Sequence, residues 1–355
     1  MSERPAPPPA DDRMRAAMAR ATAPAEGDRA LQQAVGRAAD VLADAPEVTL
    51  LAHVDPDADA LGSALALGIA LHRRGAAVQV AFATPERVPE SLAPLDVEGL
   101  VVTRAEVTRA PEVLVCCDAA EPARLGSLAG LLDTAGCTVM LDHHGTNPGF
   151  GDVQVLDPAA EATVVLAHRV LVGMDAPVDA DVARCLYAGL VTDTRGFRSA
   201  GADAHRLAAE LVEAGAEPAG LTRALMDSHP FAWFAGLGAA LGRAVLDPAA
   251  AGGHGLVRTT IPLADVRRFR SEETDSVVDV LRTAVEAEVA ASVMQVGERR
   301  WRVSLRSTGR VDVAAAARTL GGGGHRAAAG FTRDGTEEEV LAAIGAALDA
   351  AVDAG

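Results

Sequence analysis

The first two thirds of the chain alternate short apolar runs with segments of helical periodicity. The apolar runs occupy residues 48–52, 78–82, 100–103, 113–117 and 138–141. The helical patterns cover residues 31–45, 60–74, 161–172, 180–191 and 204–214. Strands that are apolar throughout are typical of parallel sheets buried on both faces. The pattern therefore predicts an α/β domain over residues 29–215, with a mostly parallel sheet flanked by helices.

The last third of the chain has a different pattern and predicts a smaller α+β domain over residues 248–352. Its expected strands are 255–261, 291–296 and 301–306, and its expected helices are 275–287, 311–319 and 337–351. A helix-rich stretch, 216–247, joins the two domains as a linker. Residues 1–28 are rich in proline, alanine and charge with little periodicity, so we expect a disordered tail there.

Composition narrows the function classes. The chain has 355 residues, with 49 acidic against 32 basic side chains and a formal net charge of -17. A binder of long duplex DNA or RNA needs a basic surface that releases counterions from phosphates, so we exclude that class. Only 3% of residues are aromatic, which leaves little for a platform that stacks single-stranded bases. We expect neither a membrane span nor a signal peptide, because the chain has no sufficiently long uncharged apolar run.

The cysteines are Cys116, Cys117, Cys137 and Cys185, and they form no CxxC pair. Three of them lie in or beside apolar runs, which is typical of small buried hydrophobic residues. We expect reduced thiols in a cytoplasmic protein and no cysteine-based zinc site.

Candidate chemistry begins where the first strand ends, in the sequence HVDPDADALGS. This segment contains His53, Asp55, Asp57 and Asp59. Ligands of open α/β sheets bind beyond the carboxyl ends of strands, as here. Carboxylates this close repel one another unless a cation lies between them, and mixed imidazole and carboxylate ligands suit an ion such as Mn, Fe or Zn. The alternative is a solvated acidic turn with Asp59 as the N-cap of the next helix.

Acidic residues and histidines also follow other predicted elements. They are Asp118, then Asp142, His143 and His144, and then Asp193 in a Thr-Asp-Thr sequence at the end of a helix. Because the ends of parallel strands converge on one edge of a sheet, these groups can meet. A single aspartate at the end of a strand is usually a cap or turn residue. Asp or His at the ends of three strands and one helix is hard to explain by capping alone, so we expect these residues to form one metal centre.

The C-terminal domain contains the run GGGGHRAAAG, which includes Gly322, Gly323, Gly324, His325 and Arg326. Glycines let backbone N–H groups approach a phosphate, and a helix N-terminus after the run would favour an anion. The alternative is a flexible loop. The embedded histidine and arginine favour a substrate-binding site.

Taken in order, HVDPDADALGS, Asp118, LDHHG, TDT and GGGGHRAAAG resemble the motifs of the DHH/DHHA1 phosphoesterase superfamily, over residues 30 to 350. The resemblance implies a DHH catalytic domain, a DHHA1 substrate-binding domain and an active site in the cleft between them. The two-domain layout is most similar to bacterial oligoribonucleases that are also pAp phosphatases, and to actinobacterial relatives that hydrolyse cyclic di-AMP. One departure is that Arg195, Gly196 and Phe197 follow the TDT motif, where relatives usually have glycine, a variable residue and an aromatic.

The resemblance also implies two divalent metal ions, manganese by analogy. The implied ligands are His53, Asp57, Asp59, Asp118, His143 and Asp193. Asp118 would take part in catalysis as the bridge between the two ions. Asp142 would orient the histidines, and His144 would face the substrate phosphate.

Other positions are assigned less directly. Asp55 is not expected to be a ligand, because many relatives carry a basic or neutral residue there. Arg306 and Ser307 match a strand that, in relatives, presents an arginine to the substrate. Without that match, we would interpret Arg306 as part of a surface salt bridge.

The implied reaction is hydrolysis of a phosphoester by a water that two metals activate. Expected substrates are short oligoribonucleotides, pAp, pApA and cyclic di-AMP, and a homodimer is expected by analogy. Three alternatives stay open. A manganese-dependent inorganic pyrophosphatase would lack the glycine–histidine run, a processive single-strand exonuclease would be longer, and a non-enzymatic nucleotide sensor would have a damaged metal site.

Overall fold

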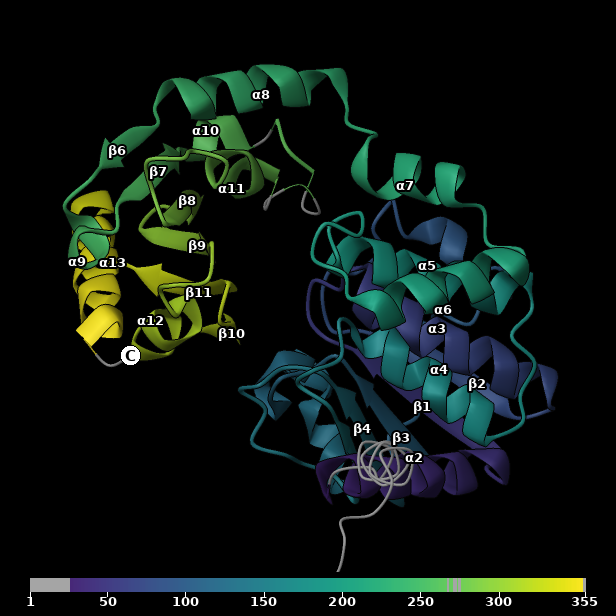
Figure 1. Ribbon diagram of the computed structural model, residues 1–355. Helices are drawn as coiled ribbons and strands as arrows, with labels where there is room; N and C mark the ends of the chain where they lie inside the picture. The colour runs from purple at the N-terminus through teal and green to yellow at the C-terminus, as the bar shows by residue number, and fades with distance from the viewer. Residues whose placement is uncertain (1–25, 267, 271–272, 274–275, 354–355) are drawn as a thin grey trace, which may run out of the picture.

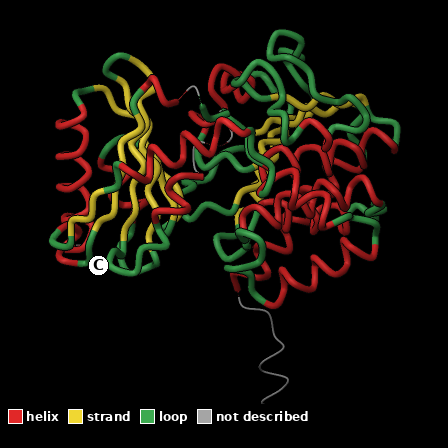
Figure 2. Tube along the Cα trace, turned by 90° about the horizontal axis from the view of Figure 1, so that it is seen from above, coloured by secondary structure: helices red, strands yellow, loops and turns green. Residues whose placement is uncertain are grey.

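The computed structural model describes residues 26–266, 268–270, 273 and 276–353, which form two lobes with one sheet each (Figures 1 and 2). Residues 1–25 of the predicted disordered tail lie outside the described residues. The helix α2, Glu26–Ala43, begins inside the last three positions of that tail. Within the described ranges, no helix combines the length and the apolar character that a membrane span requires.

The first lobe contains a parallel sheet with the strand order β2-β1-β3-β4-β5, which confirms the predicted fold class. The strands are β1 (Glu47–Ala52), β2 (Ala77–Ala81), β3 (Val113–Cys117), β4 (Cys137–Asp142) and β5 (Val153–Leu156). The predicted strand 100–103 is wrong, because it contributes only a bridge between Val101 and Val80. The Asp96 carboxylate accepts hydrogen bonds from the backbone N–H groups of Leu100 and Val101, in place of a neighbouring strand.

Alternation along the strands gives this sheet a hydrophobic layer on each face. Leu50 and Val115 lie on the face that packs against a layer of helices. These helices are α2, α3 (Ala58–Arg73), α4 (Thr163–Gly173), α5 (Ala180–Asp193) and α6 (Ala202–Glu213). Leu51 and Cys116 point to the opposite layer. Loops and the 3₁₀ segment η2 (Pro122–Asp133) cover that second face. The periodicity does not predict η2, which is interrupted at Gly126.

Two helices connect the lobes within the predicted linker. They are α7 (Pro218–Met226), which contacts α5, and α8 (Phe231–Gly242), which contacts α11 (Ser276–Leu281) of the second lobe (Figure 1). Residues 245–247 of the same linker form β6, an edge strand of the second sheet.

The second sheet is mixed and has the order β10-β11-β9-β8-β7-β6, which matches the expected smaller α+β unit. Its strands are β6 (Val245–Asp247), β7 (Leu256–Ile261), β8 (Val289–Gly297), β9 (Arg300–Ser307), β10 (Gly323–His325) and β11 (Ala328–Asp334). One face packs against α12 (Val313–Thr319) and α13 (Glu337–Asp353). Arg302 and Arg306 stand opposite Met294 and Ala290, whose side chains lie on the other face, beside α8 and α11.

The glycine run forms a β-hairpin. The prediction of a helix N-terminus after the run is wrong, because α12 precedes the glycines, and Gly323 and Gly324 begin strand β10, which is followed by β11. Gly324 has a φ of +134°, and a Cβ at Gly322 would lie 2.1 Å from the carbonyl oxygen of Gly330. Tight pairing in the hairpin therefore requires glycine at these two positions.

Candidate metal centre

The first sheet brings the candidate ligands to one edge. β1 pairs with β2 on one side and with β3 on the other, so the connections run in opposite directions from β1. Ligands of open α/β sheets bind at such a switch point, outside the carboxyl ends of the strands. His53 and Asp57 follow β1, Asp118 follows β3, and Asp142 is the last residue of β4.

Asp118 lies at the centre of the cluster. Its Oδ2 is 3.5 Å from His53 Nε2, and its Oδ1 is 3.6 Å from His143 Nε2. Two groups of three side chains converge: His53, Asp57 and Asp118, and Asp59, Asp118 and His143. Asp193 Oδ2 is 3.3 Å from His143 Nε2 and so adjoins the second group. All six residues expected as metal ligands therefore lie together.

The two histidines present Nε2 to the carboxylates. His143 Nδ1 donates a hydrogen bond to the carbonyl oxygen of Ala160 (3.0 Å), and His53 Nδ1 donates to that of Val54 (2.8 Å). His143 Nε2 is buried and has no well-formed hydrogen bond to any described residue. An orphaned imidazole nitrogen among carboxylates fits a divalent ion with mixed nitrogen and oxygen ligands.

Without a cation, the cluster holds protons on its histidines. Burial opposes charge on His53, but hydrogen bonding to Asp118 outweighs burial and raises the pKa of His53 to about 10. Burial also opposes charge on His143, yet the carboxylate of Asp193 raises its pKa to about 11. Burial raises the pKa of Asp193 itself to about 6. A metal ion here would have to displace protons.

Asp59 is not the N-cap of α3, as the alternative of a solvated acidic turn would require. The N-cap of α3 is Asp57, whose side chain accepts from the N–H groups of Asp59 and Ala60. Asp59 instead accepts from the N–H groups of Thr163 (2.7 Å) and Val164 (2.9 Å) at the start of α4. These two bonds orient the carboxylate toward His143.

Thr163 is a site residue that the sequence does not predict. Its hydroxyl donates to Asp118 Oδ1 at 2.8 Å, and its backbone N–H donates to Asp59. It is fully buried and holds two carboxylates of the centre at once. A threonine at a helix start is common, so nothing in its local sequence marks this role.

His144 connects the centre to the second lobe. Its Nδ1 donates to Asp142 Oδ1 at 2.7 Å, and Asn147 Nδ2 donates to Asp142 Oδ2 at 2.6 Å. The ring of His325 stacks on His144 with centroids 4.1 Å apart and planes 16° apart. Burial and the charge of His144 lower the pKa of His325 to about 3, so His325 is neutral beside it. His325 is thus the member of the glycine run that reaches the cluster.

Two other candidates have partners within their own lobe. The Ser307 hydroxyl donates to Glu288 at 3.0 Å, and the Arg326 guanidinium donates to the carbonyl oxygens of Gly309 and Arg310. These contacts stabilise turns of the second lobe. Among the described residues, no hydrogen bond or ion pair joins Ser307 or Arg326 to the metal centre, so their expected substrate role stays a prediction.

The lobes also meet through charged side chains. Arg302 of β9 donates to Asp55 Oδ2 at 2.8 Å. This ion pair gives Asp55, which was not expected to be a metal ligand, a role in the contact between the lobes. Arg270 lies 3.5 Å from Glu90. Both pairs join the second lobe to loops of the first.

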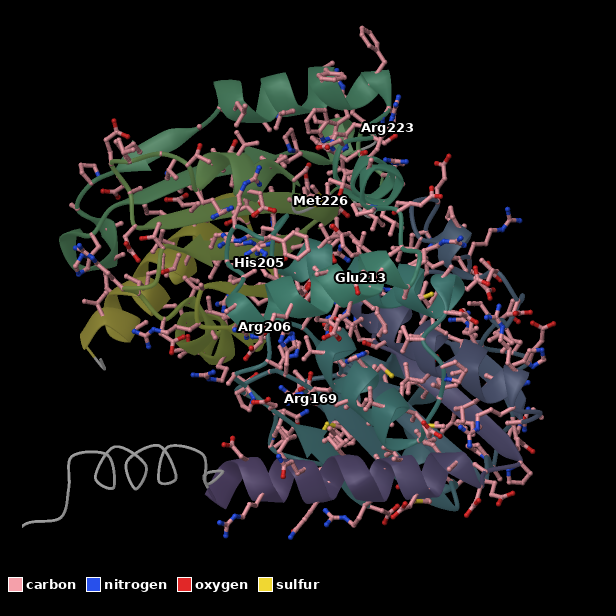
Figure 3. The ribbon with its side chains drawn as sticks, turned by 45° about the vertical axis from the view of Figure 1, so that its right-hand side comes forward. Arg169, His205, Arg206, Glu213, Arg223 and Met226 are labelled. Carbon is pink, nitrogen blue, oxygen red and sulfur yellow. The ribbon has the colours of Figure 1, made fainter. Side chains whose placement is uncertain are left out.

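A group of arginines lies near the end of α5, the helix whose last residue is Asp193. The Nε atoms of Arg306 and Arg282 lie 3.3 and 3.2 Å from the same Oδ1 of Asp279. Arg195 follows Asp193 by two residues, on the loop before α6, the helix that carries His205 and Arg206 in Figure 3. Burial and the positive charge of Arg282 lower the pKa of Arg195, so the two guanidiniums are near one another.

Comparison with known proteins agrees with this arrangement. Residues 47–190 match the family described as the DHH family, N-terminal domain, and residues 264–354 match the DHHA1 domain. The chain is 33% identical over 304 residues to the bifunctional oligoribonuclease and PAP phosphatase NrnA of Thermus thermophilus, covering 84% of this chain and 89% of the relative. An uncharacterized protein of Mycoplasma pneumoniae, the MG371 homolog, is 25% identical over 56% of this chain and 59% of its own length.

A solved structure has the same fold. The exopolyphosphatase-related protein from Bacteroides fragilis superimposes with a TM-score of 0.79 over 91% of this chain and 97% of its own. The sequence identity is 20%, so this likeness concerns the two-lobed architecture alone.

Proposed function

The chain belongs to the DHH/DHHA1 phosphoesterase superfamily, and from this premise we propose that it hydrolyses short nucleotides to mononucleotides. The proposed substrates are oligoribonucleotides of a few residues, pAp, pApA and cyclic di-AMP. The name of the Thermus relative supports the first two. The observation that carries the proposal is the position of Asp118, which belongs to both groups of converging histidine and carboxylate side chains.

The six clustered side chains would hold two divalent ions. His53, Asp57 and Asp118 would hold one ion, and Asp59, Asp118, His143 and Asp193 would hold the other. Manganese is proposed by analogy with the superfamily, and the carboxylates of the set suit it. When bound, such ions supply Lewis acidity that lowers the pKa of water and neutralises charge on phosphoryl oxygens.

His144 is proposed to act on the substrate phosphate. Burial opposes its charge, but the hydrogen bond from Nδ1 to Asp142 outweighs this effect and raises the pKa of His144. When protonated, the ring has a second N–H, at Nε2, that can donate to a phosphoryl or leaving-group oxygen. Asp142, held in turn by Asn147, fixes the orientation of the ring. His325 covers one face of His144 and would exclude water from it.

The overall charge favours a small substrate. With a formal net charge of -17, the chain would repel a long polyanion over most of its surface. A short nucleotide needs only the region between the lobes, where His325 reaches the metal centre.

An activity panel tests this proposal. Purified protein with Mn²⁺ is incubated with pAp, pApA, cyclic di-AMP, an RNA ladder of two to five nucleotides, and pyrophosphate. We expect hydrolysis of at least one short nucleotide and none of pyrophosphate. Hydrolysis of pyrophosphate alone would overturn the proposal.

Two variants test the assigned centre. Asp118→Ala and His143→Ala should abolish hydrolysis while the circular dichroism spectrum is preserved, because each removes a ligand of the shared cluster. Arg206→Gln is a matched surface control, since Arg206 pairs with Asp203 on an exposed helix face. Full activity in either of the first two variants would refute the two-metal assignment.

Two further expectations belong to the proposal. A homodimer is expected from the resemblance and is tested by light scattering after gel filtration. A cytoplasmic location is expected because the four cysteines are free and three of them are buried. Fractionation of cells that express the protein tests the location.

A further inference from the structure

The linker helix α8 is apolar on every side, including the side that faces solvent. Its sequence, FAWFAGLGAALG, has no charged residue, and its only polar side-chain group is the indole N–H of Trp233. Gly236 and Ala240 are buried, whereas Phe231 is 89% exposed and Phe234 is 60% exposed. In Figure 1, α8 lies along the outside of the molecule, with the second lobe on one side of it. A helix that is apolar all round is typical of an element covered on all sides, so its outer face fits a partner surface.

The two exposed phenylalanines belong to a fixed aromatic group. Their ring centroids lie 6.2 Å apart, and the ring of Trp233 meets that of Phe234 edge-on at 5.1 Å. Trp233 is itself held, because its Nε1 donates to the Ser276 hydroxyl at 3.0 Å and its ring stacks on His229. A group fixed in this way loses little side-chain entropy when it enters an interface, which is the property of an aromatic anchor.

The C-terminal half of the same face consists of small residues. Four residues at spacings of four, three and four positions form one stripe along the helix, and they are Phe231, Ala235, Gly238 and Gly242. A Cβ at Gly238 or Gly242 would meet no other atom within 4 Å, so this half of the stripe is open. The side chain of a partner can therefore approach the backbone of α8 closely there.

A large end and a small end make the stripe complementary to itself. When a second copy of α8 lies antiparallel to the first, about a two-fold axis at the middle of the helix, Phe231 of each copy lies opposite the partner's Gly242. Ala235 then lies opposite the partner's Gly238. A parallel pair would instead place phenylalanine against phenylalanine and glycine against glycine. Because α8 has no charged residue, the antiparallel pair also brings no like charges together along the helix.

The area of the face agrees with a weak dimer. An aromatic side chain buries about 150 to 250 Å², so the exposed parts of Phe231 and Phe234 amount to roughly 300 Å² in each copy. Two copies would bury roughly 600 Å² through these side chains. The small residues, along about 18 Å of helix, bring the total toward the ~1,000 Å² of a specific interface. We therefore expect a dissociation constant in the micromolar range.

We propose that α8 is the surface through which two copies of this chain associate, as an antiparallel helix pair. The resemblance implies a homodimer but no surface for it. This inference goes beyond the proposed function, because α8 contains no residue of the metal centre. Since α8 contacts α11 and β7, the pair joins the second lobes of the two copies, and each first lobe keeps its own set of metal ligands.

Sedimentation velocity of the full chain, over a wide range of protein concentration, tests the surface. The wild-type protein should pass from monomer to dimer. Phe231→Asp should raise the dissociation constant at least about 30-fold, the effect of losing one aromatic anchor, and Gly238→Leu should weaken the dimer by filling the open half. Both positions face open space, so the circular dichroism spectrum should not change. Val285→Asp is the matched control, because Val285 is 93% exposed on the second lobe but lies outside α8, and it should keep the wild-type dissociation constant.

Cysteine variants test the orientation. When Ala235→Cys and Gly238→Cys proteins are mixed and oxidised, disulfide-linked dimers should exceed those of either protein alone, because the two positions lie opposite each other only in the antiparallel pair. Equal linkage in all three samples would overturn the antiparallel arrangement. A wild-type protein that stays monomeric, or a dimer that Phe231→Asp and Gly238→Leu leave intact, would overturn the surface itself. Binding of the monomer to phosphatidylcholine vesicles that Phe231→Asp abolishes would assign the face to a membrane and would also overturn the proposal.

Discussion

Loading the metal centre should release protons, and their number follows from the side chains that face the site. In the metal-free protein at pH 7.5, His53 and His143 are protonated, because their pKa values are raised to about 10 and about 11. Asp193, with a pKa of about 6, is already ionised. Nδ1 of each ring is held by a backbone carbonyl, so a metal must take the place of the proton on Nε2. We therefore expect about two protons to leave when both ions bind.

The same reasoning gives the pH dependence of metal affinity. A raised pKa means that the folded protein binds its proton tightly, so metal binding weakens as the pH falls. Each proton released changes the apparent association constant about tenfold per pH unit, and two protons give about 100-fold between pH 7 and pH 8. Burial, Asp193 and Asp118 also raise the pKa of Asp59, and a protonated Asp59 would add a third proton.

Calorimetric titration with Mn²⁺ measures this release. The apparent enthalpy is compared in two buffers of different ionisation enthalpy at pH 7.0 and at pH 8.0, and the slope gives the protons released. His143→Gln removes one titrating ring, so the release should fall by about one proton. An apparent enthalpy that is independent of the buffer would refute the reasoning, and so would a release that His143→Gln leaves unchanged.

Three further predictions concern the support of the centre. Gly189→Ala should weaken Mn²⁺ binding and lower activity, because its Cβ would lie 2.8 Å from Asp59 Cα, whereas Gly238→Ala, with open space at its Cβ, should leave Mn²⁺ affinity at the wild-type value. Asp142→Asn should lower kcat about 10- to 100-fold with an unchanged circular dichroism spectrum, and wild-type turnover would contradict this. Leu65→Ala, in the fully buried core of α3, should lower the free energy of unfolding in urea by about 2 to 5 kcal/mol, and a loss under about 1 kcal/mol would mean that the site is loosely packed.

The parallel sheet and the cluster of ligands could be predicted from the sequence, because both follow from which residues are neighbours along the chain. A strand that is apolar throughout has to be buried on both faces, and the residue that follows it has to emerge at the edge of the sheet. Asp118 follows Cys117 directly, and His53 follows Ala52 in the same way. Their meeting required only that β1 and β3 be parallel and adjacent, as they are.

The contacts that orient these ligands were not predictable in the same way. Asp59 and Thr163 are 104 residues apart, and the bond between them uses a backbone N–H that every residue except proline has. The hairpin of Gly322 and Gly324 was missed for a related reason. A run of glycines permits many backbone paths, and packing against Phe331 and Ala329 selects one of them only in the folded protein.

The distribution of charge connects the metal centre and the proposed substrate. Asp57, Asp59, Asp118 and Asp193 contribute four of the negative charges in the total of -17, and two divalent ions would compensate for all four. The remaining surface stays acidic and repels long polyanions at distances up to the Debye length, about 10 Å. The region between the lobes, where His325 of the second lobe stacks on His144 of the first, is the proposed position of the substrate. A short nucleotide can bind there beside the metal centre, whereas a longer chain must extend over the acidic surface. A preference for short substrates then follows from the distribution of charge, without a steric barrier.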